Sequence, residues 1–241
     1  MVQAIAGCNA DFWCEYGCIQ IFIENHKVTI NRAEALAAEQ LKSAFSRTFP
    51  DVRVLSGLIV TLPKESRIPT GEFDCLVVCN AGLFAFEVKG WKNCTVHRRK
   101  EGIRNRWFLD CKERNDNEVA DPLAQGCEKM IGLKTYIDPR IKVRSYVLLP
   151  MEGVELDPTM PAGVITAQEL PYIPRLLKSQ VKASTQFSLL DCEMVDMLAG
   201  HLQELAQGNH LEAHIENCRR FHASKTAVAI ASVPQHALLE S

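Results

Sequence analysis

Asp74, Glu87 and Lys89 are the residues of this 241-residue chain whose types and spacing best suit chemistry. Asp74 begins one apolar stretch, and Glu87 and Lys89 lie two positions apart in another, so a strand would place both on one face. Charged groups inside apolar strands are costly to bury unless they pair or bind a metal. Two carboxylates can hold Mg²⁺ with several waters, and a neighbouring lysine can orient an attacking water or stabilise phosphate charge. The pattern therefore indicates phosphodiester hydrolysis.

A β-hairpin is the element expected to position these residues. Residues 76–79 and 83–88 are short apolar runs rich in β-branched and aromatic side chains. Between them, Asn80-Ala81-Gly82 has a composition that favours a tight turn.

The register of this hairpin decides whether Asp74 and Glu87 can share a metal. Directly opposed residues of an antiparallel pair point the same way. If Asp74 opposes Glu87, Cys79 lies opposite Gly82, with two residues in the turn or a four-residue loop. A regular three-residue loop at 80–82 would send the two carboxylates to opposite faces instead.

At these positions the sequence resembles the nuclease-related domain (NERD) family of the PD-(D/E)XK nuclease superfamily. The matching string is Glu72-Phe-Asp74 followed by Gly82-Leu-Phe-Ala-Phe-Glu87-Val-Lys89-Gly. The resemblance implies a DNA nuclease dependent on Mg²⁺ or Mn²⁺, acting in DNA processing or in defence against foreign DNA. It implies that Asp74 and Glu87 are metal ligands, that Lys89 faces the water or scissile phosphate, and that Glu72 supports them. The alternative is a catalytically inactive nucleic-acid-binding or interaction module on the same fold.

The resemblance extends to a helix downstream. Asp121-Pro-Leu-Ala-Gln125 is similar to the Asn-Pro-Leu-x-Gln signature that follows the Glu-x-Lys strand in NERD proteins, and Asp can cap a helix as well as Asn. With proline at the first position, a helix is predicted over 122–137. The resemblance implies that Gln125 contacts the metal-bound water or a phosphate, while a solvent-facing glutamine is the alternative. Lys129, one turn on, is a weaker candidate for the same cleft.

Glu34 has two possible roles. An amphipathic helix is predicted over 32–48 with Asn31 as its N-cap, which puts Glu34 at the capping-box position. Glu34 also lies on the apolar stripe with Leu41 and Phe45. NERD proteins carry a glutamate at the start of this helix that reaches the active site, so the resemblance implies a catalytic role for Glu34.

Residues 89–114 form a basic stretch. They contain nine Lys or Arg against three acidic residues, a net charge of +6 in a chain whose total is −2. Trp91, Trp107 and Phe108 are interleaved with the basic residues, which suits nucleic acid because arginines contact phosphate and aromatic faces stack on bases. A twisted hairpin with a solvated face is the alternative. The candidate DNA-contacting residues are Lys92, Arg98, Arg99, Lys100, Arg104 and Arg106.

The order of the predicted elements indicates an α/β fold. Further strands are expected at 52–62, 143–149 and 163–166, and further helices at 167–178, 187–206 and 211–221. We expect a mixed central β-sheet flanked by helices, a restriction-endonuclease-like core with C-terminal helices. The expected organisation is an N-terminal extension (1–30), a NERD-like nuclease domain (31–182), a C-terminal helical segment (183–222) and a mobile tail (223–241).

The remaining expectations concern environment and partners. Ten cysteines occur without any Cys-x-x-Cys pair, so reduced thiols are expected. No signal peptide or membrane-length apolar stretch is found, which predicts a cytoplasmic protein with no membrane partner. DNA is the expected partner, and a homo-oligomer or a larger complex is possible. His210, His214 and Cys218 fall on one helical stripe, but zinc would need a fourth ligand, so we expect no metal there.

Overall fold

The computed structural model describes residues 23–231 except 65, 67, 68, 102, 103, 112, 113 and 188. The helices are α1 (Ile23–Ser46), α2 (Pro122–Leu133), α3 (Ile173–Lys182), α4 (Cys192–Ala206) and α5 (Leu211–Ala231), with 3-10 helices η2 (Lys134–Tyr136) and η3 (Leu170–Tyr172). The strands are β1 (Val52–Thr61), β2 (Thr70–Cys79), β3 (Gly82–Val88), β4 (Cys94–Glu101), β5 (Arg104–Cys111), β6 (Arg114–Val119), β7 (Val143–Leu149), β8 (Val154–Leu156) and β9 (Val164–Thr166).

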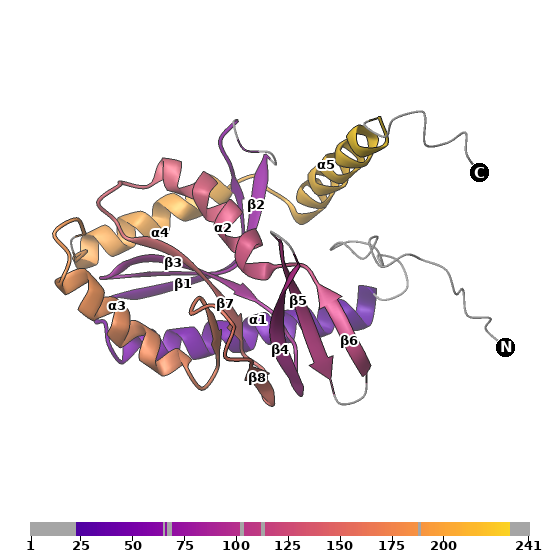
Figure 1. Ribbon diagram of the computed structural model, residues 1–241. Helices are drawn as coiled ribbons and strands as arrows, with labels where there is room; N and C mark the ends of the chain where they lie inside the picture. The colour runs from indigo at the N-terminus through magenta and orange to yellow at the C-terminus, as the bar shows by residue number, and fades with distance from the viewer. Residues whose placement is uncertain are drawn as a thin grey trace, which may run out of the picture.

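A five-stranded mixed sheet forms the centre of the fold, in the order β1-β2-β3-β7-β9 (Figure 1). β1, β2 and β3 pair antiparallel, whereas β7 runs parallel to β3 and β9 parallel to β7. α1 and α3 bury apolar side chains against one face, and α2 and α4 cover the other. The prediction of an α/β fold with a mixed sheet flanked by helices is confirmed.

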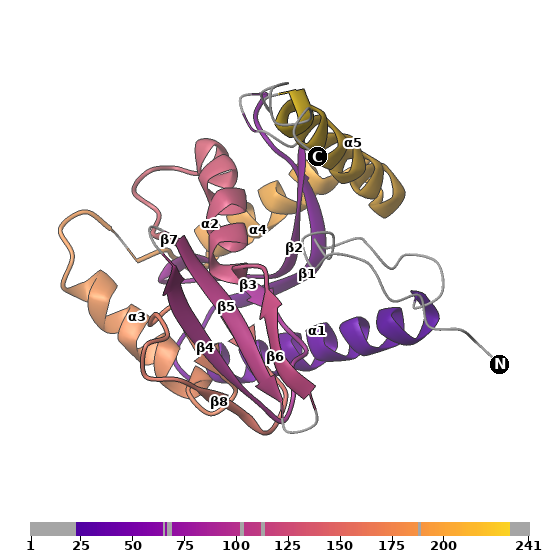
Figure 2. The same ribbon diagram turned by 45° about the vertical axis from the view of Figure 1, so that its right-hand side comes forward.

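The basic stretch forms a separate sheet, which the sequence analysis did not distinguish from the central one. β4 and β5 pair antiparallel as expected for a hairpin, and β6 and β8 extend the sheet on either side in the order β6-β5-β4-β8 (Figure 2). Val96 and Trp107 on its inner face share a buried core with Val147 of β7. Burial of these apolar side chains fixes the second sheet against the first.

The central hairpin has the register that shared metal binding requires. Cys79 pairs with Gly82 and Cys75 with Phe86, so two residues form the turn. Continuing this register by one residue brings Asp74 opposite Glu87. The three-residue alternative, which would have separated the carboxylates, is excluded.

Several helix boundaries differ from the predictions: α2 ends at Leu133 instead of 137, α3 begins at Ile173 instead of 167, and α4 begins at Cys192 instead of 187. α1 begins at Ile23, so Asn31 lies inside the helix and is not its N-cap. The capping-box role of Glu34 is therefore wrong, because that role requires the first turn. α5 continues to Ala231, so residues 223–231 are helical where a tail was expected. The expected boundary at residue 30 likewise falls within α1, while residues 1–22 lie outside the described part.

The thiol prediction is confirmed for the cysteines that the structure describes. All seven are free: Cys75, Cys79, Cys94, Cys111, Cys127, Cys192 and Cys218. Over the described residues, no helix has both the length and the apolar character needed to cross a membrane.

Candidate active site

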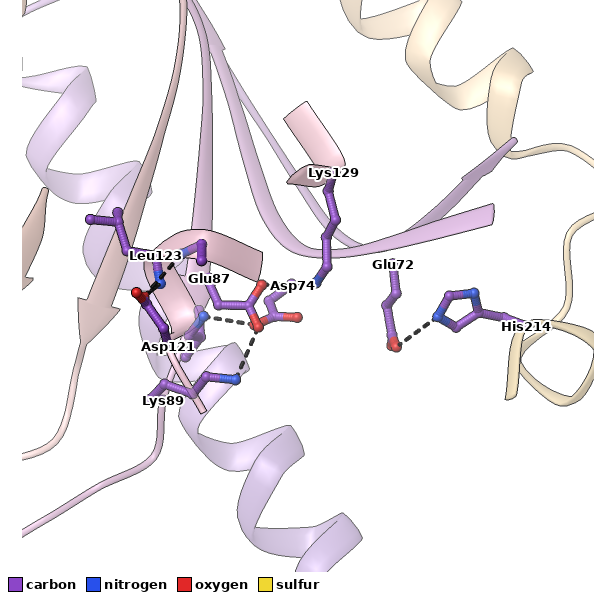
Figure 3. A network of polar contacts seen from close by, with 10 residues as sticks. Glu72, Asp74, Glu87, Lys89, Asp121, Leu123, Lys129 and His214 are labelled. Atoms are coloured by element: carbon purple, nitrogen blue, oxygen red, sulfur yellow. Dashed lines mark hydrogen bonds and ion pairs between the residues drawn. The ribbon is translucent and has the colours of Figure 1, made fainter. Parts of the chain in front are cut away.

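Asp74 and Glu87 lie side by side on the face of the central sheet that α2 covers (Figure 3). Asp74 accepts a hydrogen bond through Oδ2 from the backbone N–H of Val88 at 2.7 Å, which fixes its carboxylate next to β3. That bond uses one oxygen and leaves the other to ligate a cation. The expected pair of carboxylates is thus brought together at the end of the hairpin.

Glu87 is held between two lysines. Lys89 Nζ donates to Oε1 and Lys129 Nζ donates to Oε2, each at 2.9 Å. Only 8% of the Glu87 side chain is exposed, whereas each lysine remains about one-quarter exposed. Burial raises the pKa of Glu87, but the two ammonium groups outweigh burial and hold its pKa below the usual range. Glu87 is therefore ionised, and Lys129 is a stronger member of the site than the sequence analysis expected.

Gly126 lets α2 approach this site. A Cβ atom at Gly126 would lie 2.4 Å from Ser145 Oγ and 3.9 Å from Glu87 Cβ, so a larger residue would require the Ser145 side chain to move. Asp121 caps the helix by accepting from Leu123 N and Ala124 N, as predicted. The sequence analysis did not single out Gly126, although a glycine inside a helix costs about 1 kcal/mol relative to alanine, and that cost indicates a packing role.

Glu34 belongs to the same electrostatic cluster. Burial, followed by the charges of Asp74, Glu72 and Glu87, raises the pKa of Glu34 to about 7. Burial and Glu87 similarly raise the pKa of Asp74 to about 6. Glu72 follows the same direction, because burial raises its pKa more than the nearby lysines lower it. Burial and neighbouring negative charge therefore raise the pKa of three carboxylates around Glu87, and a nearby divalent cation would relieve that repulsion.

These pKa shifts predict a pH-dependent cost to the metal-free fold. Since the folded state holds the protons of Glu34 and Asp74 more tightly than the unfolded chain does, stability from these groups is present at low pH and lost as pH rises from about 4 to about 7. Asp74→Asn removes the titration of Asp74 and leaves that of Glu34. Without metal, the variant should therefore become more stable relative to the wild type as pH rises from about 4 to about 7, seen as an increasing difference between their melting temperatures. A difference that is constant between pH 4 and pH 8 would contradict the prediction.

Gln125 lies in the first turn of α2, partly buried, with its backbone N–H donating to Asp121 O at 3.2 Å. This places it one residue before the close approach at Gly126. Its role in catalysis stays a prediction.

The candidate DNA-contacting residues divide between the faces of the second sheet. Arg99 and Arg106 oppose each other on the outer face, where Arg99 stacks over Phe108 at 4.6 Å and Arg106 pairs with Glu118 at 2.7 Å. Arg98 shares the inner face with Trp107, and its Nη2 donates to Thr159 O at 3.4 Å. Lys92 is exposed before β4, while Lys100 and Arg104 lie on β4 and β5.

The second sheet lies on the same side of the central sheet as the carboxylates. Glu87 pairs with Val147 across β3 and β7, so both side chains project from one face. Val147 packs into the core shared with β4 and β5, as does Leu123 of α2. The basic sheet therefore borders the side of the molecule that carries Glu87.

The donor set suits a Mg²⁺ or Mn²⁺ ion bound by few protein ligands. Mg²⁺ is usually held by one or two carboxylates and keeps several waters, and Asp74 with Glu87 supplies that number. The raised pKa of Asp74, caused first by burial and then by Glu87, is the sign of uncompensated negative charge that a cation would relieve. Within the described ranges, no three His, Cys, Asp or Glu side chains form a metal-binding group.

Comparison with known proteins gave one match. A family model described as a nuclease-related domain matches residues 30–150, which is 121 of the 241 residues. The match includes α1 from residue 30 onward, the central hairpin, the first three strands of the second sheet, α2 and β7. No curated protein and no solved structure matches the chain.

Proposed function

Because the chain belongs to the nuclease-related domain family, we propose that it is a divalent-metal-dependent DNA nuclease, acting in DNA processing or in defence against foreign DNA. The observation that carries the proposal is the opposed pair Asp74 and Glu87, with Lys89 Nζ 2.9 Å from Glu87 Oε1. Apolar strands have no structural need for this group of charges. We also propose that its core is of the restriction-endonuclease-like (PD-(D/E)XK) type.

Each residue of the site would have a distinct task in phosphodiester hydrolysis. Asp74 and Glu87 would hold Mg²⁺ or Mn²⁺, which supplies Lewis-acid stabilisation of phosphate charge and a more acidic bound water. Lys89 would stabilise charge developing on the scissile phosphate or orient the attacking water. With its pKa raised to about 7 by burial and by the neighbouring carboxylates, Glu34 could exchange a proton near neutral pH. Gln125 would contact the attacking water or a phosphate.

A cleavage assay tests the proposal directly. Supercoiled plasmid, linear duplex and single-stranded DNA are incubated with the full chain and Mg²⁺, Mn²⁺ or EDTA. We expect cleavage of at least one DNA form with metal and none with EDTA. The absence of cleavage of every form with either metal would refute the nuclease proposal.

A second candidate is a DNA-binding module without hydrolysis. It is favoured by the two ion pairs of Glu87, because both carboxylate oxygens already have ammonium partners. A metal would have to share at least one of these oxygens with an ammonium group. DNA binding without cleavage in the same assay would select this candidate.

The exposed basic residues of the second sheet and of the segment just before it should supply much of the DNA affinity. Replacing the exposed residues Lys92 and Arg99 with alanine should weaken binding and lower the log–log salt slope by about one for each lost phosphate contact. Fluorescence anisotropy at several salt concentrations measures both quantities. Lys42→Ala is the matched control, because Lys42 is exposed on α1, which covers the opposite face of the central sheet. If all variants bind DNA with equal affinity and equal salt slope, Lys92 and Arg99 face solvent and do not contact DNA.

A further inference from the structure

The helix α5 lies outside the segment that matches the family model, yet it packs beside the strand that carries Asp74 (Figures 1 and 2). Polar contacts fix it at two points. Just before the helix, Asn209 Nδ2 donates to the backbone oxygen of Ile59 in β1 at 3.0 Å. Within the first turn, His214 is buried against β2 with only 5% of its surface exposed. The start of α5 is therefore anchored to β1 and β2.

The imidazole of His214 bridges three side chains. Its Nδ1 lies 2.8 Å from Thr70 Oγ1, and its Nε2 lies 3.9 Å from Glu72 Oε2 and 3.6 Å from Cys218 Sγ. Burial, followed by the charge of Lys129, lowers the pKa of His214, so the ring is neutral at pH 7. Of the two neutral tautomers, the one in which Nδ1 accepts from the Thr70 hydroxyl would direct the Nε2 proton toward Glu72.

His214 reaches the strand face that holds the candidate metal ligand. Thr70, Glu72 and Asp74 alternate along β2, so all three project to the same side. Glu72 is the middle one of the three, with His214 on one side and the carboxylate cluster on the other (Figure 3). The 3.9 Å separation is longer than a hydrogen bond, so the proposed contact requires a small rotation of the Glu72 side chain, which is 39% exposed.

We propose that His214 is a positioning residue of the candidate site, which holds the Glu72 carboxylate beside Asp74 and Glu87 and makes α5 part of the site. This inference rests on the proposed metal-dependent function. A fixed carboxylate next to the ligands adds negative charge and can accept a hydrogen bond from a metal-bound water. Removal of such supporting partners typically lowers metal affinity or activity 10- to 100-fold.

A double-mutant cycle on the full chain tests the inference. Mn²⁺ binding is measured by electron paramagnetic resonance and DNA cleavage in parallel, for His214→Ala, Glu72→Gln and the double variant. We expect each single variant to bind Mn²⁺ about tenfold more weakly, and the double variant to be no worse than either, because the two residues act as one unit. His210→Ala is the matched control, since His210 is exposed one turn earlier on the same chain segment. Additive losses, or unchanged Mn²⁺ affinity in folded His214→Ala, would overturn the inference.

Two further variants separate positioning from helix docking. Asparagine at 214 places a polar atom near the position of Nδ1 and keeps the contact with Thr70, while glutamine reaches toward the position of Nε2. We expect His214→Gln to retain most Mn²⁺ affinity and His214→Asn to lose it, with similar melting temperatures. If both variants lose affinity only in proportion to lost stability, the role is structural and the inference fails.

The metal readout also separates this inference from the proposed nuclease activity. A wild-type protein that binds Mn²⁺ without cleaving DNA would refute the nuclease proposal and leave the Mn²⁺ cycle to decide the role of His214. Wild-type protein that binds no Mn²⁺ would overturn both.

Discussion

Asp74→Asn is expected to abolish metal-dependent DNA cleavage while raising the melting temperature of the metal-free protein. Asparagine can still accept the hydrogen bond from Val88 N, which in the structure is 2.7 Å long. Burial and the charge of Glu87 raise the pKa of Asp74 to about 6, which means that the ionised side chain destabilises the metal-free fold at pH 7 and above. Asparagine removes this charge and so removes its repulsion from Glu87. Activity should fall about 10²-fold or more, because a metal ligand has been lost.

Glu87→Gln should lose cleavage to the same extent with the opposite effect on stability. Its charge is stabilised by Lys89 and Lys129, so neutralising it removes two ion pairs and should lower the melting temperature. Titration with Mn²⁺, followed by calorimetry, should show weaker metal binding for both variants. Glu39→Ala, an exposed carboxylate on α1, is the control and should match the wild type. Full cleavage by either site variant would exclude that carboxylate as a metal ligand.

Lys89→Ala is expected to keep metal binding and to lose turnover. The substitution leaves Asp74 and Glu87 in place, and Glu87 keeps its ion pair with Lys129 at 2.9 Å. The protein should therefore stay folded, with a stability loss below the 3–5 kcal/mol typical of stranding a buried charge. The cleavage rate should fall about 10²-fold, the scale of one electrostatic contact to the transition state.

Lys129→Ala is the matched variant for this prediction, because Lys129 makes an ion pair of the same length with the other oxygen of Glu87. If Lys89 acts on the phosphate, Lys89→Ala should lose more turnover than Lys129→Ala at equal stability. Equal losses would mean that both lysines only hold Glu87. The double variant strands Glu87, which is 8% exposed, and should lose about 3–5 kcal/mol of unfolding free energy.

The parts of the site that follow local rules could be predicted from the sequence. Alternating apolar residues predicted the two strands of the hairpin, and the Asp121-Pro pair predicted the start of α2, whereas the register that pairs Asp74 with Glu87 was one of two alternatives. These are periodicity and capping effects that depend on neighbouring residues. The start of α1 was missed because Asn31 looks like a cap when the preceding turns are not recognised as helical.

The contacts that depend on tertiary packing could not be predicted. Lys129 reaches Glu87 because Gly126 lets α2 lie against β3. The sequence spacing of these residues does not predict the 2.9 Å separation of Lys129 Nζ and Glu87 Oε2. His214 reaches Glu72 across 142 positions of the chain, counted from the residue numbers. The division of the strands into two sheets follows from the packing of Trp107 against β7. The periodicity of the sequence predicts strands but not the sheet to which each strand belongs.

The two-residue turn of the central hairpin restricts where this protein can be engineered. Asn80 binds Asp51 through both side-chain atoms, donates to Leu190 O at 2.9 Å and accepts from Leu190 N at 2.8 Å, so the turn is clamped from two distant segments. Ala81 is fully buried. Hairpin turns are usually permissive sites for inserted tags, labels or new chain termini. Here one added residue would break the clamp and rotate Asp74 away from Glu87, so such insertions belong elsewhere on the surface.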